Sequence, residues 1–318
     1  MTTTVHWSKM QERGTYLGMK ILLLCYAILG RKGLSIILYP VIVYLYFTGG
    51  ESKKASLNYL GKIAERKGWA KRPGHREGIK HFYTFAQGAF DKIDAWTGKI
   101  TMDQVNYNYD DKFRKLLEEE QGAVFIGSHL GNLEVCRTLS VGKYKTRINV
   151  LVFTHHAVEF NKIMQKINPN VNVNFIQVKD VGVDLAILLK QRVEAGEKVV
   201  IVGDRTSTTS PGRVVYADFL GQKAPFSQGP FILASLLECP VYYLFCLKDG
   251  ERYNLIFEHV ADQLKFARKT RQAEIGELIN QYAQRLEHFC LQYPYQWFNF
   301  FDFWQEDHKV DRKHSLEK

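Results

Sequence analysis

The sequence predicts an α/β fold in which a central, mostly parallel or mixed sheet is flanked by helices, with N-terminal helices that associate with a membrane. Three observations lead to this prediction. From about residue 120, short apolar runs typical of buried strands alternate with helical patterns. Two long apolar runs lie within the first 50 residues. The excess positive charge is confined to the first 80 residues.

The chain has 318 residues, of which 46% are hydrophobic and 24% are charged. This apolar share is sufficient for a sizeable core in one large domain or two small ones. It excludes globally disordered, collagen-like and disulfide-framed proteins. The five cysteines are odd in number and form no C-x-x-C pair, so we expect free thiols in a reduced, cytosol-facing compartment. They are Cys25, Cys136, Cys239, Cys246 and Cys290.

Residues 1–80 are predicted to form a basic, membrane-anchoring helical region. They hold 14 basic side chains and only four acidic ones, a net charge of +10, so the rest of the chain is neutral overall. The apolar runs cover residues 21–30 and 34–47. A 14-residue helix covers about 21 Å, less than the ~30 Å hydrocarbon core of a bilayer. We therefore expect helices embedded in one leaflet, with Pro40 kinking or interrupting the second run.

Two other interpretations of this region remain open. A pair of buried helices in a soluble domain has the same apolar character. Nucleic-acid binding accounts less well for the charge, because the aromatic side chains lie among aliphatic ones rather than on a basic stacking surface. Beyond this region we expect an α/β domain over residues 81–308 and a polar tail over residues 309–318.

The apolar patterns also place the individual elements. Strands are predicted at residues 123–127, 149–153, 173–178, 198–202, 213–219, 241–247 and 253–260. Helices are predicted from about residue 132 and at residues 158–167, 183–195, 230–237 and 268–290. Residues 206–212 form a polar loop directly after a strand, which makes them a candidate site loop.

A polar turn, SHLGNLE at residues 128–134, stands where a buried strand ends and a helix is expected to begin. Ligands bind at such strand ends in open α/β sheets. If His129 lies in the turn, which Gly131 would allow, and Glu134 lies in the first helical turn, their side chains can meet. A carboxylate on one imidazole nitrogen leaves the other as a base that can take a proton from an acceptor hydroxyl. Asn132 is a predicted substrate-binding residue. The alternative is a buried histidine beside a helix-capping acid.

A second polar group follows the strand predicted at residues 198–202. Asp204 and Arg205 should emerge on the same edge of the sheet as the histidine. Arg205 carries a permanent charge that could stabilise a developing oxyanion, and Asp204 is a predicted substrate-binding residue. The alternative is an Asp–Arg pair that braces a loop. Gly221 and Gly229 belong to segments that suit either an acyl-chain groove or ordinary loop packing, and we expect both to bind substrate.

These motifs together resemble a known family. GSHLGNLE at residues 127–134 is similar to the H-x4-D/E motif of glycerolipid acyltransferases, and its glutamate and Gly-Asn pair resemble most closely the bacterial acyltransferases of lipid A biosynthesis. GDRT at residues 203–206, the segment at residues 212–234 and YPYQWF at residues 293–298 are similar to further elements of that family. The resemblance covers about residues 10–305.

The resemblance implies a glycerolipid-acyltransferase-like fold and transfer of a fatty acyl chain to a hydroxyl of a lipid or glycolipid. The implied donor is acyl carrier protein, which would also be a partner, or acyl-CoA. The implied location is the bacterial inner membrane, with the catalytic domain facing the cytoplasm. No bound cofactor, metal or nucleic acid is implied. Carried over residue by residue, His129 is the base, Glu134 orients it and Arg205 stabilises charge.

Two departures from the family pattern leave the acceptor open. The region after the second predicted strand has few basic side chains, Lys162 and Lys166, and the closing segment carries Asp302 where the family has basic residues. The opening segment VHWSKMQERGTYLGMK resembles a divergent branch associated with aryl polyene, flexirubin-like or aminoacyl-lipid pathways. An intermediate of such a pathway is therefore the alternative to a lipid A precursor.

Other activities also remain as alternatives. A thioesterase or other hydrolase could use the same base on water, although the chain has no G-x-S-x-G nucleophile elbow. A non-catalytic membrane scaffold is the third possibility. His155 and His156 do not indicate a metal site, because no further ligand follows at a suitable spacing.

Overall fold

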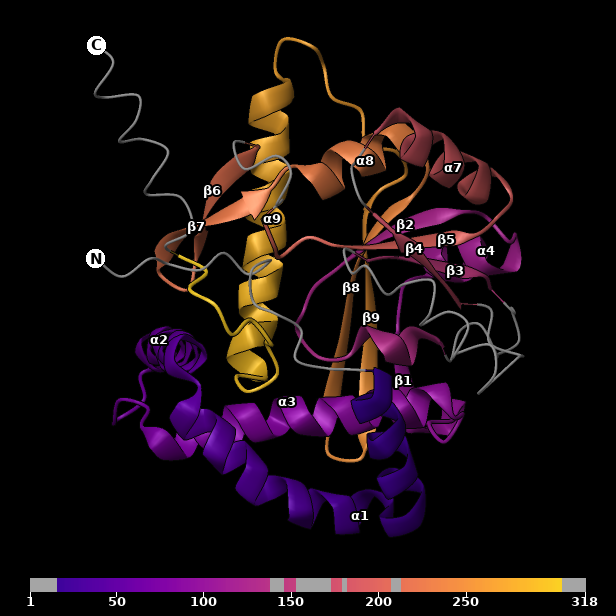
Figure 1. Cartoon of the computed structure of the whole chain (residues 1–318). Coiled ribbons are helices and arrows are strands. Elements are labelled where there is room, and N and C mark those ends of the chain that lie inside the picture. The colour runs from indigo at the N-terminus through magenta and orange to yellow at the C-terminus, as the bar shows by residue number, and fades with distance from the viewer. Residues whose placement is uncertain (1–15, 138–145, 153–172, 179–181, 207–212, 305–318) are drawn as a thin grey trace. The chain divides into compact units, whose positions relative to one another are not determined.

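The computed structural model describes residues 16–137, 146–152, 173–178, 182–206 and 213–304 (Figure 1). It is an α/β structure with a seven-stranded mixed sheet flanked by helices, which confirms the predicted fold class. The chain forms two compact units. Unit 1 comprises Met1–Ile93, Asp218–Pro225 and Glu287–Lys318, and unit 2 comprises Asp94–Ala217 and Phe226–Leu286. The boundary that the sequence suggested after residue 80 falls inside helix α3 (His75–Trp96).

The large sheet belongs to unit 2. In spatial order its strands are β1 (Val105–Asn108), β9 (Arg252–Ala261), β8 (Val241–Asp249), β2 (Ala123–Gly127), β5 (Lys198–Val202), β3 (Ile148–Val152) and β4 (Val173–Gln177). Neighbouring strands are parallel except β8 and β9, which are antiparallel. Six of these strands match predicted ones, and β1 was not predicted. The two central strands, β2 and β5, are almost wholly buried, as their continuous apolar runs indicated.

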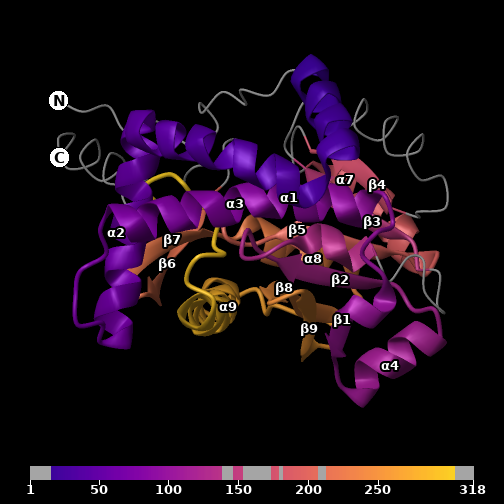
Figure 2. The ribbon, with the colours of Figure 1, turned by 90° about the horizontal axis from the view of Figure 1, so that it is seen from below.

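Helices cover both faces of this sheet. On one face, α4 (Asp111–Glu118) inserts Phe113, whose ring stacks on that of Phe257 in β9 at 4.1 Å between centroids. On the other face lie α8 (Gly229–Leu237) and α9 (Arg271–Gln292), and their Phe231 and Tyr282 rings contact each other at 5.7 Å. Tyr282 also packs on Tyr243 of β8. Helix α7 (Val183–Glu194) packs beside α8 and β5 (Figures 1 and 2).

Two elements near the site were predicted only in part. Directly after β2, the structure has a short 3-10 helix, η3 (Leu133–Arg137), and residues 138–145 lie outside the described residues. The strand predicted at residues 213–219 is confirmed as β6 (Val214–Phe219), which pairs with an unpredicted strand, β7 (Gln222–Ser227), in a separate two-stranded sheet. Its partner β7 had been interpreted as groove or loop. The predicted helix at residues 158–167 and most of the predicted loop at residues 206–212 also lie outside the described residues.

In unit 1, the N-terminal helix α1 (Tyr16–Thr48) bends at Gly30, and the part after the bend runs antiparallel to α3 (Figures 1 and 2). Side-chain contacts join α1 to α3 on both sides of the bend. Tyr26 packs on Phe90 at 5.5 Å between ring centroids, Arg31 pairs with Asp91 at 2.6 Å, and Tyr39 contacts Tyr83 at 5.6 Å. One face of the part of α1 that follows Gly30 therefore lies along another helix of the same unit.

The other face of α1 is apolar and exposed. Ile36 is 75% exposed, Tyr44 is 66% exposed, and eight further large apolar side chains of this helix are exposed as well. Residues 28–48 form a 21-residue helix with a mean hydropathy of 1.5, long and apolar enough by length and composition to cross a membrane. The shorter length expected from sequence counted only the apolar run. Helical backbone continues through Pro40, and the break occurs at Gly30, whose φ is 65°.

The closing segment of the chain lies in the core of unit 1 with helix α2 (Gly50–Lys67). Trp297 is fully buried and packs on Tyr59 of α2 at 5.0 Å between centroids. His81 of α3 is fully buried too. Its Nδ1 accepts from Ser56 Oγ at 2.9 Å, and its Nε2 donates to the Trp297 carbonyl at 2.9 Å. Both ring nitrogens therefore have partners, and burial lowers the pKa of His81 to about 4.

Candidate active site

The candidate site begins where the two central parallel strands end together. In the register of β2 and β5, Gly127 faces Val202, and the ladder extends one step further because Gly203 N donates to Gly127 O at 2.9 Å. Tyr282 of α9 donates its hydroxyl to the same carbonyl at 2.7 Å. The residues that follow each strand therefore start from fixed positions at the carboxyl edge of the sheet, the edge where ligands bind in open α/β sheets.

His129 and Asp204 stand two residues beyond these strand ends, and the structure joins them by two hydrogen bonds. His129 Nδ1 lies 2.8 Å from Asp204 Oδ1, and the His129 backbone N donates to Asp204 Oδ2 at 2.8 Å. The Asp204 side chain is fully buried, whereas 26% of the His129 side chain is exposed. Because a carboxylate only accepts, Nδ1 carries the proton, and the neutral ring has its lone pair on Nε2.

Gly131 fixes the turn that carries His129. Its φ is 76°, and a Cβ at this position would lie 1.8 Å from the carbonyl oxygen of Cys246 in β8. Asn132 N donates to that oxygen at 2.9 Å, so the turn is bound to the neighbouring strand. Ser128 is buried and its hydroxyl accepts from Leu130 N at 3.2 Å. Only glycine fits at position 131 without strain, because the positive φ and the close approach to the Cys246 carbonyl both exclude a side chain.

Glu134 and Asn132 lie at the start of η3. Asn132 Oδ1 accepts from Glu134 N at 3.2 Å, an arrangement that caps the short helix. Asn132 is buried, and its Nδ2 has no hydrogen-bond partner among the described residues. The Glu134 carboxylate accepts from Trp96 Nε1 at 3.0 Å. The carboxylate on His129 Nδ1 is therefore that of Asp204, whereas the sequence pattern had suggested Glu134 for this position.

The structure places the other three predicted site residues, Arg205, Gly229 and Gly221, in different elements. Arg205 is half-buried and directly follows Asp204. Gly229 begins α8, and its N–H donates to Ser227 Oγ at 3.2 Å. Gly221 belongs to unit 1, where it has a φ of 80° in the tight turn between β6 and β7. Its glycine conformation thus has an explanation in the turn itself.

Sequence reasoning did not foresee the roles of Trp96 and Tyr282. Trp96 lies 38 positions before its partner Glu134, so no local pattern connects them. Tyr282 lies within the helix predicted at residues 268–290, and no sequence feature connected it to the strand end. The pairing of His129 with Asp204 did have a sequence signal, because both follow the end of a predicted buried strand by two residues.

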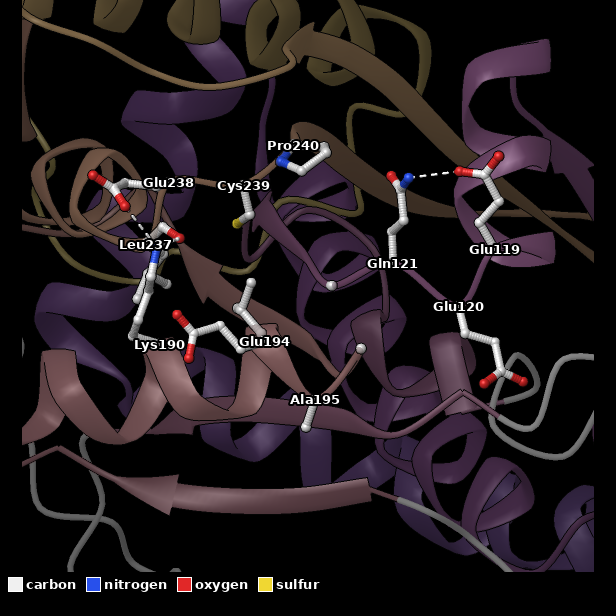
Figure 3. Close-up of a pocket in the computed structure, with 13 residues that line it drawn as sticks. Glu119, Glu120, Gln121, Lys190, Glu194, Ala195, Leu237, Glu238, Cys239 and Pro240 are labelled. Carbon is white, nitrogen blue, oxygen red and sulfur yellow. Dashed lines mark hydrogen bonds and ion pairs between the residues drawn. The ribbon is translucent and has the colours of Figure 1, made fainter.

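A pocket of about 590 Å³ lies at the opposite, amino edge of the same strands (Figure 3). It is lined by residues that precede β2, β5 and β8, among them Glu120, Glu194 and Glu238. Lys190 pairs with Glu238 at 2.8 Å, and the pocket contains no histidine. Because β2 and β5 are parallel, this pocket and the His129–Asp204 pair lie at opposite ends of the strands.

Residues 80–306 match the family model of bacterial lipid A biosynthesis acyltransferases, which covers well over half of the chain. The protein belongs to this family. It is therefore an acyltransferase, and the family assignment made from the sequence motifs is confirmed. No curated protein matches the sequence of this acyltransferase. In the parts of the chain that the structure describes, no three His, Cys, Asp or Glu side chains form a group able to hold a metal ion. His155 and His156 lie outside those parts.

Proposed function

We propose that this acyltransferase moves a fatty acyl chain from a thioester, on acyl carrier protein or CoA, to a hydroxyl of a lipid or glycolipid. The reaction takes place at the cytoplasmic face of the bacterial inner membrane, with His129 as the general base. The observation that carries the proposal is the His129 ring, which a buried carboxylate holds at the carboxyl edge of the sheet while part of the ring remains exposed.

The chemistry needs one proton acceptor in this position. His129 Nε2 removes the proton from the acceptor hydroxyl as its oxygen attacks the thioester carbonyl carbon. The tetrahedral intermediate collapses, the carbon–sulfur bond breaks, and the sulfur leaves as a thiol after it receives the proton from the imidazolium. The products are an ester and a free thiol, so no oxidant, metal or covalent enzyme intermediate is required.

Charge develops on the carbonyl oxygen during this step. Arg205 follows Asp204 at the strand end and is proposed to stabilise that oxyanion, because guanidinium is permanently charged and donates several hydrogen bonds. Asn132 and Gly229 are proposed to contact the substrate from the turn after β2 and the start of α8. Glu134 is proposed to shape the same turn through its contact with Trp96.

Membrane association is proposed to run through α1. Its contacts with α3 extend from Tyr26 to Tyr46, so the opposite, exposed apolar face lies parallel to a helix with charged side chains. This arrangement favours a helix embedded in one leaflet over one that spans the bilayer. The double substitution Ile36→Asp, Tyr44→Asp should release the protein from vesicles containing anionic lipids. Ile187→Asp, at an equally apolar exposed position of α7, should not.

Two classes of acceptor remain. One is a lipid A precursor, and the other is a less anionic intermediate of an aryl polyene or aminoacyl-lipid pathway. Two departures of the sequence from the family pattern support the second class: few basic side chains after the second predicted strand, and Asp302 in the closing segment. A phosphorylated acceptor is better matched by basic side chains than by a carboxyl group.

Accurate-mass lipid profiling of host cells tests the activity and identifies the acceptor. Cells carrying the wild-type gene should contain a species heavier by one acyl chain, and cells carrying His129→Ala should lack it. The mass shift would give the chain length. Free fatty acid without an acylated lipid would instead indicate a hydrolase. Identical profiles for the two genes would contradict the proposed function and favour a non-catalytic scaffold.

A further inference from the structure

The structure assigns to Asp204 the role of positioning the His129 base, in place of the glutamate of the H-x4-E pattern. This inference rests on the proposed function and specifies how its base is held. The assignment follows from which carboxylate occupies the Nδ1 side of the imidazole.

The two hydrogen bonds to Asp204 fix both the tautomer and the orientation of the His129 ring. One Asp204 oxygen accepts from the His129 backbone N–H and the other accepts from Nδ1–H, both at 2.8 Å. Nδ1 has a single hydrogen, so a second carboxylate cannot take the same place. The pair of bonds fixes the tautomer, and because it joins the side chain to the backbone of the same residue, it also fixes the side-chain rotamer.

Asp204 is also well placed to be rigid. Its side chain is fully buried, and it stands two residues after the end of β5, as His129 stands two residues after the end of β2. The carboxyl end of β2 is bound to Gly203 N and to the Tyr282 hydroxyl through the Gly127 carbonyl. The distance between the two side chains is thus set by the strand pairing itself. A carboxylate with this burial is stable only when donors point at it, which the two N–H groups of His129 do.

Glu134 has a different environment. Its carboxylate accepts from Trp96 Nε1 at 3.0 Å, and its backbone N–H donates to Asn132 Oδ1. These two contacts hold the end of the turn. Glutamine keeps an oxygen that accepts from Trp96, so Glu134→Gln should preserve this contact. Asparagine at position 204 cannot preserve both of its contacts. It has only one side-chain oxygen, so its NH₂ group would face either the backbone N–H or the Nδ1–H of His129.

The decisive comparison is therefore between Asp204→Asn and Glu134→Gln, two substitutions that replace a carboxylate by an amide of the same size. Initial rates are measured on the acylated product that lipid profiling identifies. We expect Asp204→Asn to lower kcat by about 10²–10⁴-fold with little change in KM, because the ring would lose the required tautomer. Glu134→Gln should keep kcat within about tenfold of wild type. A loss confined to Glu134→Gln would overturn the assignment.

A spectroscopic measurement on the wild-type protein tests the assignment even if Asp204→Asn fails to fold. In protein labelled with ¹⁵N-histidine, long-range ¹H–¹⁵N spectra distinguish the two neutral tautomers, and His129→Ala identifies the signals. We expect the proton of His129 on Nδ1 and its loss from that position in Asp204→Asn. A proton on Nε2 in the wild type would overturn the inference. Full activity of His129→Ala, by contrast, would contradict the proposed function. The spectrum would still show which nitrogen of His129 carries the proton.

Discussion

The two ends of strands β2 and β5 both bury charged groups, but with different consequences. At the carboxyl ends, the fully buried Asp204 holds His129, whose side chain remains 26% exposed. At the amino ends, Lys198 is 1% exposed, and its Nζ donates to the carbonyls of Gly196, at 2.9 Å, and Gln121. Burial lowers the pKa of Lys198 to about 8.

This difference shows that a shifted pKa or a buried charge does not by itself mark a catalytic group. The Lys198 ammonium is occupied by backbone carbonyls, and the neighbouring Glu197 accepts from Asn149 Nδ2 at 2.8 Å. The amino ends thus resemble a closed structural network. At the carboxyl ends, a buried carboxylate makes two hydrogen bonds to a histidine whose ring is still partly exposed, which is an arrangement that a general base requires.

The largest effect is expected when a residue at the carboxyl ends of β2 and β5 is replaced, and a residue at their amino ends serves as the comparison. His129→Ala should lower kcat by at least about 10²-fold, because general-base catalysis contributes roughly 10²–10⁴-fold. Lys198→Met should leave kcat within about threefold and instead lower the free energy of unfolding by about 1–3 kcal/mol, since two carbonyls lose a donor. Product formation and chemical denaturation measure the two quantities. Equal losses of kcat in both variants would refute the distinction between the ends.

The sequence supported most of the sheet but not all of the site. Continuous apolar runs are strong signals because strands buried on both faces are mostly apolar, and six of the seven sheet strands were predicted. Strand β1, with the sequence VNYN, lies at the edge of the sheet and has no such run. Strand β7 contains Pro225 and lies in a small separate sheet, so its pattern resembled a loop.

Within the site, sequence spacing predicted the edge where His129 and Asp204 meet, but not which carboxylate would bind the ring. The H-x4-E spacing suggests a local contact through a helical turn. In the structure, the turn is bound to β8 through Gly131, and Glu134 accepts from Trp96. Such contacts depend on strand order and on residues distant in the chain, which local spacing does not encode.

The next effect concerns the turn that holds the base. Gly131→Ala should lower the free energy of unfolding by about 2–4 kcal/mol, because alanine is unfavourable at a φ of 76° and its Cβ would meet the Cys246 carbonyl. Gly182→Ala is the matched control: no atom lies within 4 Å of the added Cβ, and its φ is −97°. Denaturant unfolding of both variants measures this. A similar stability of the two would show that the turn can move away from β8.

The buried ring of His81 gives a third prediction, which is measured as the pH dependence of stability. Burial lowers the pKa of His81 from 6.5 to about 4. Between these values the unfolded chain takes up a proton that the folded protein does not bind. The free energy of unfolding therefore falls as the pH decreases below 6.5, by about 1.4 kcal/mol per pH unit from this residue.

The pH dependence is checked by denaturant unfolding between pH 7 and pH 4. His81→Gln should flatten the slope, and His288→Gln, at an exposed position of α9, should leave it unchanged. If the first variant does not fold, NMR titration of the wild type gives the same information, since His81 should stay neutral at pH 5. A His81 ring that becomes protonated near pH 6.5 would contradict its burial and its two hydrogen bonds.

The smallest effect is expected at the amino-edge pocket. Glu194→Gln and Glu238→Gln should each leave kcat within about twofold, because the pocket and His129 lie at opposite ends of the parallel strands. Glu238→Gln removes a pair with Lys190 in which 59% of the glutamate side chain is exposed, so the free energy of unfolding should hardly change. A tenfold loss of kcat in either variant, with unchanged unfolding, would mean that the amino ends take part in the reaction. The separation between a structural end and a catalytic end would then no longer hold.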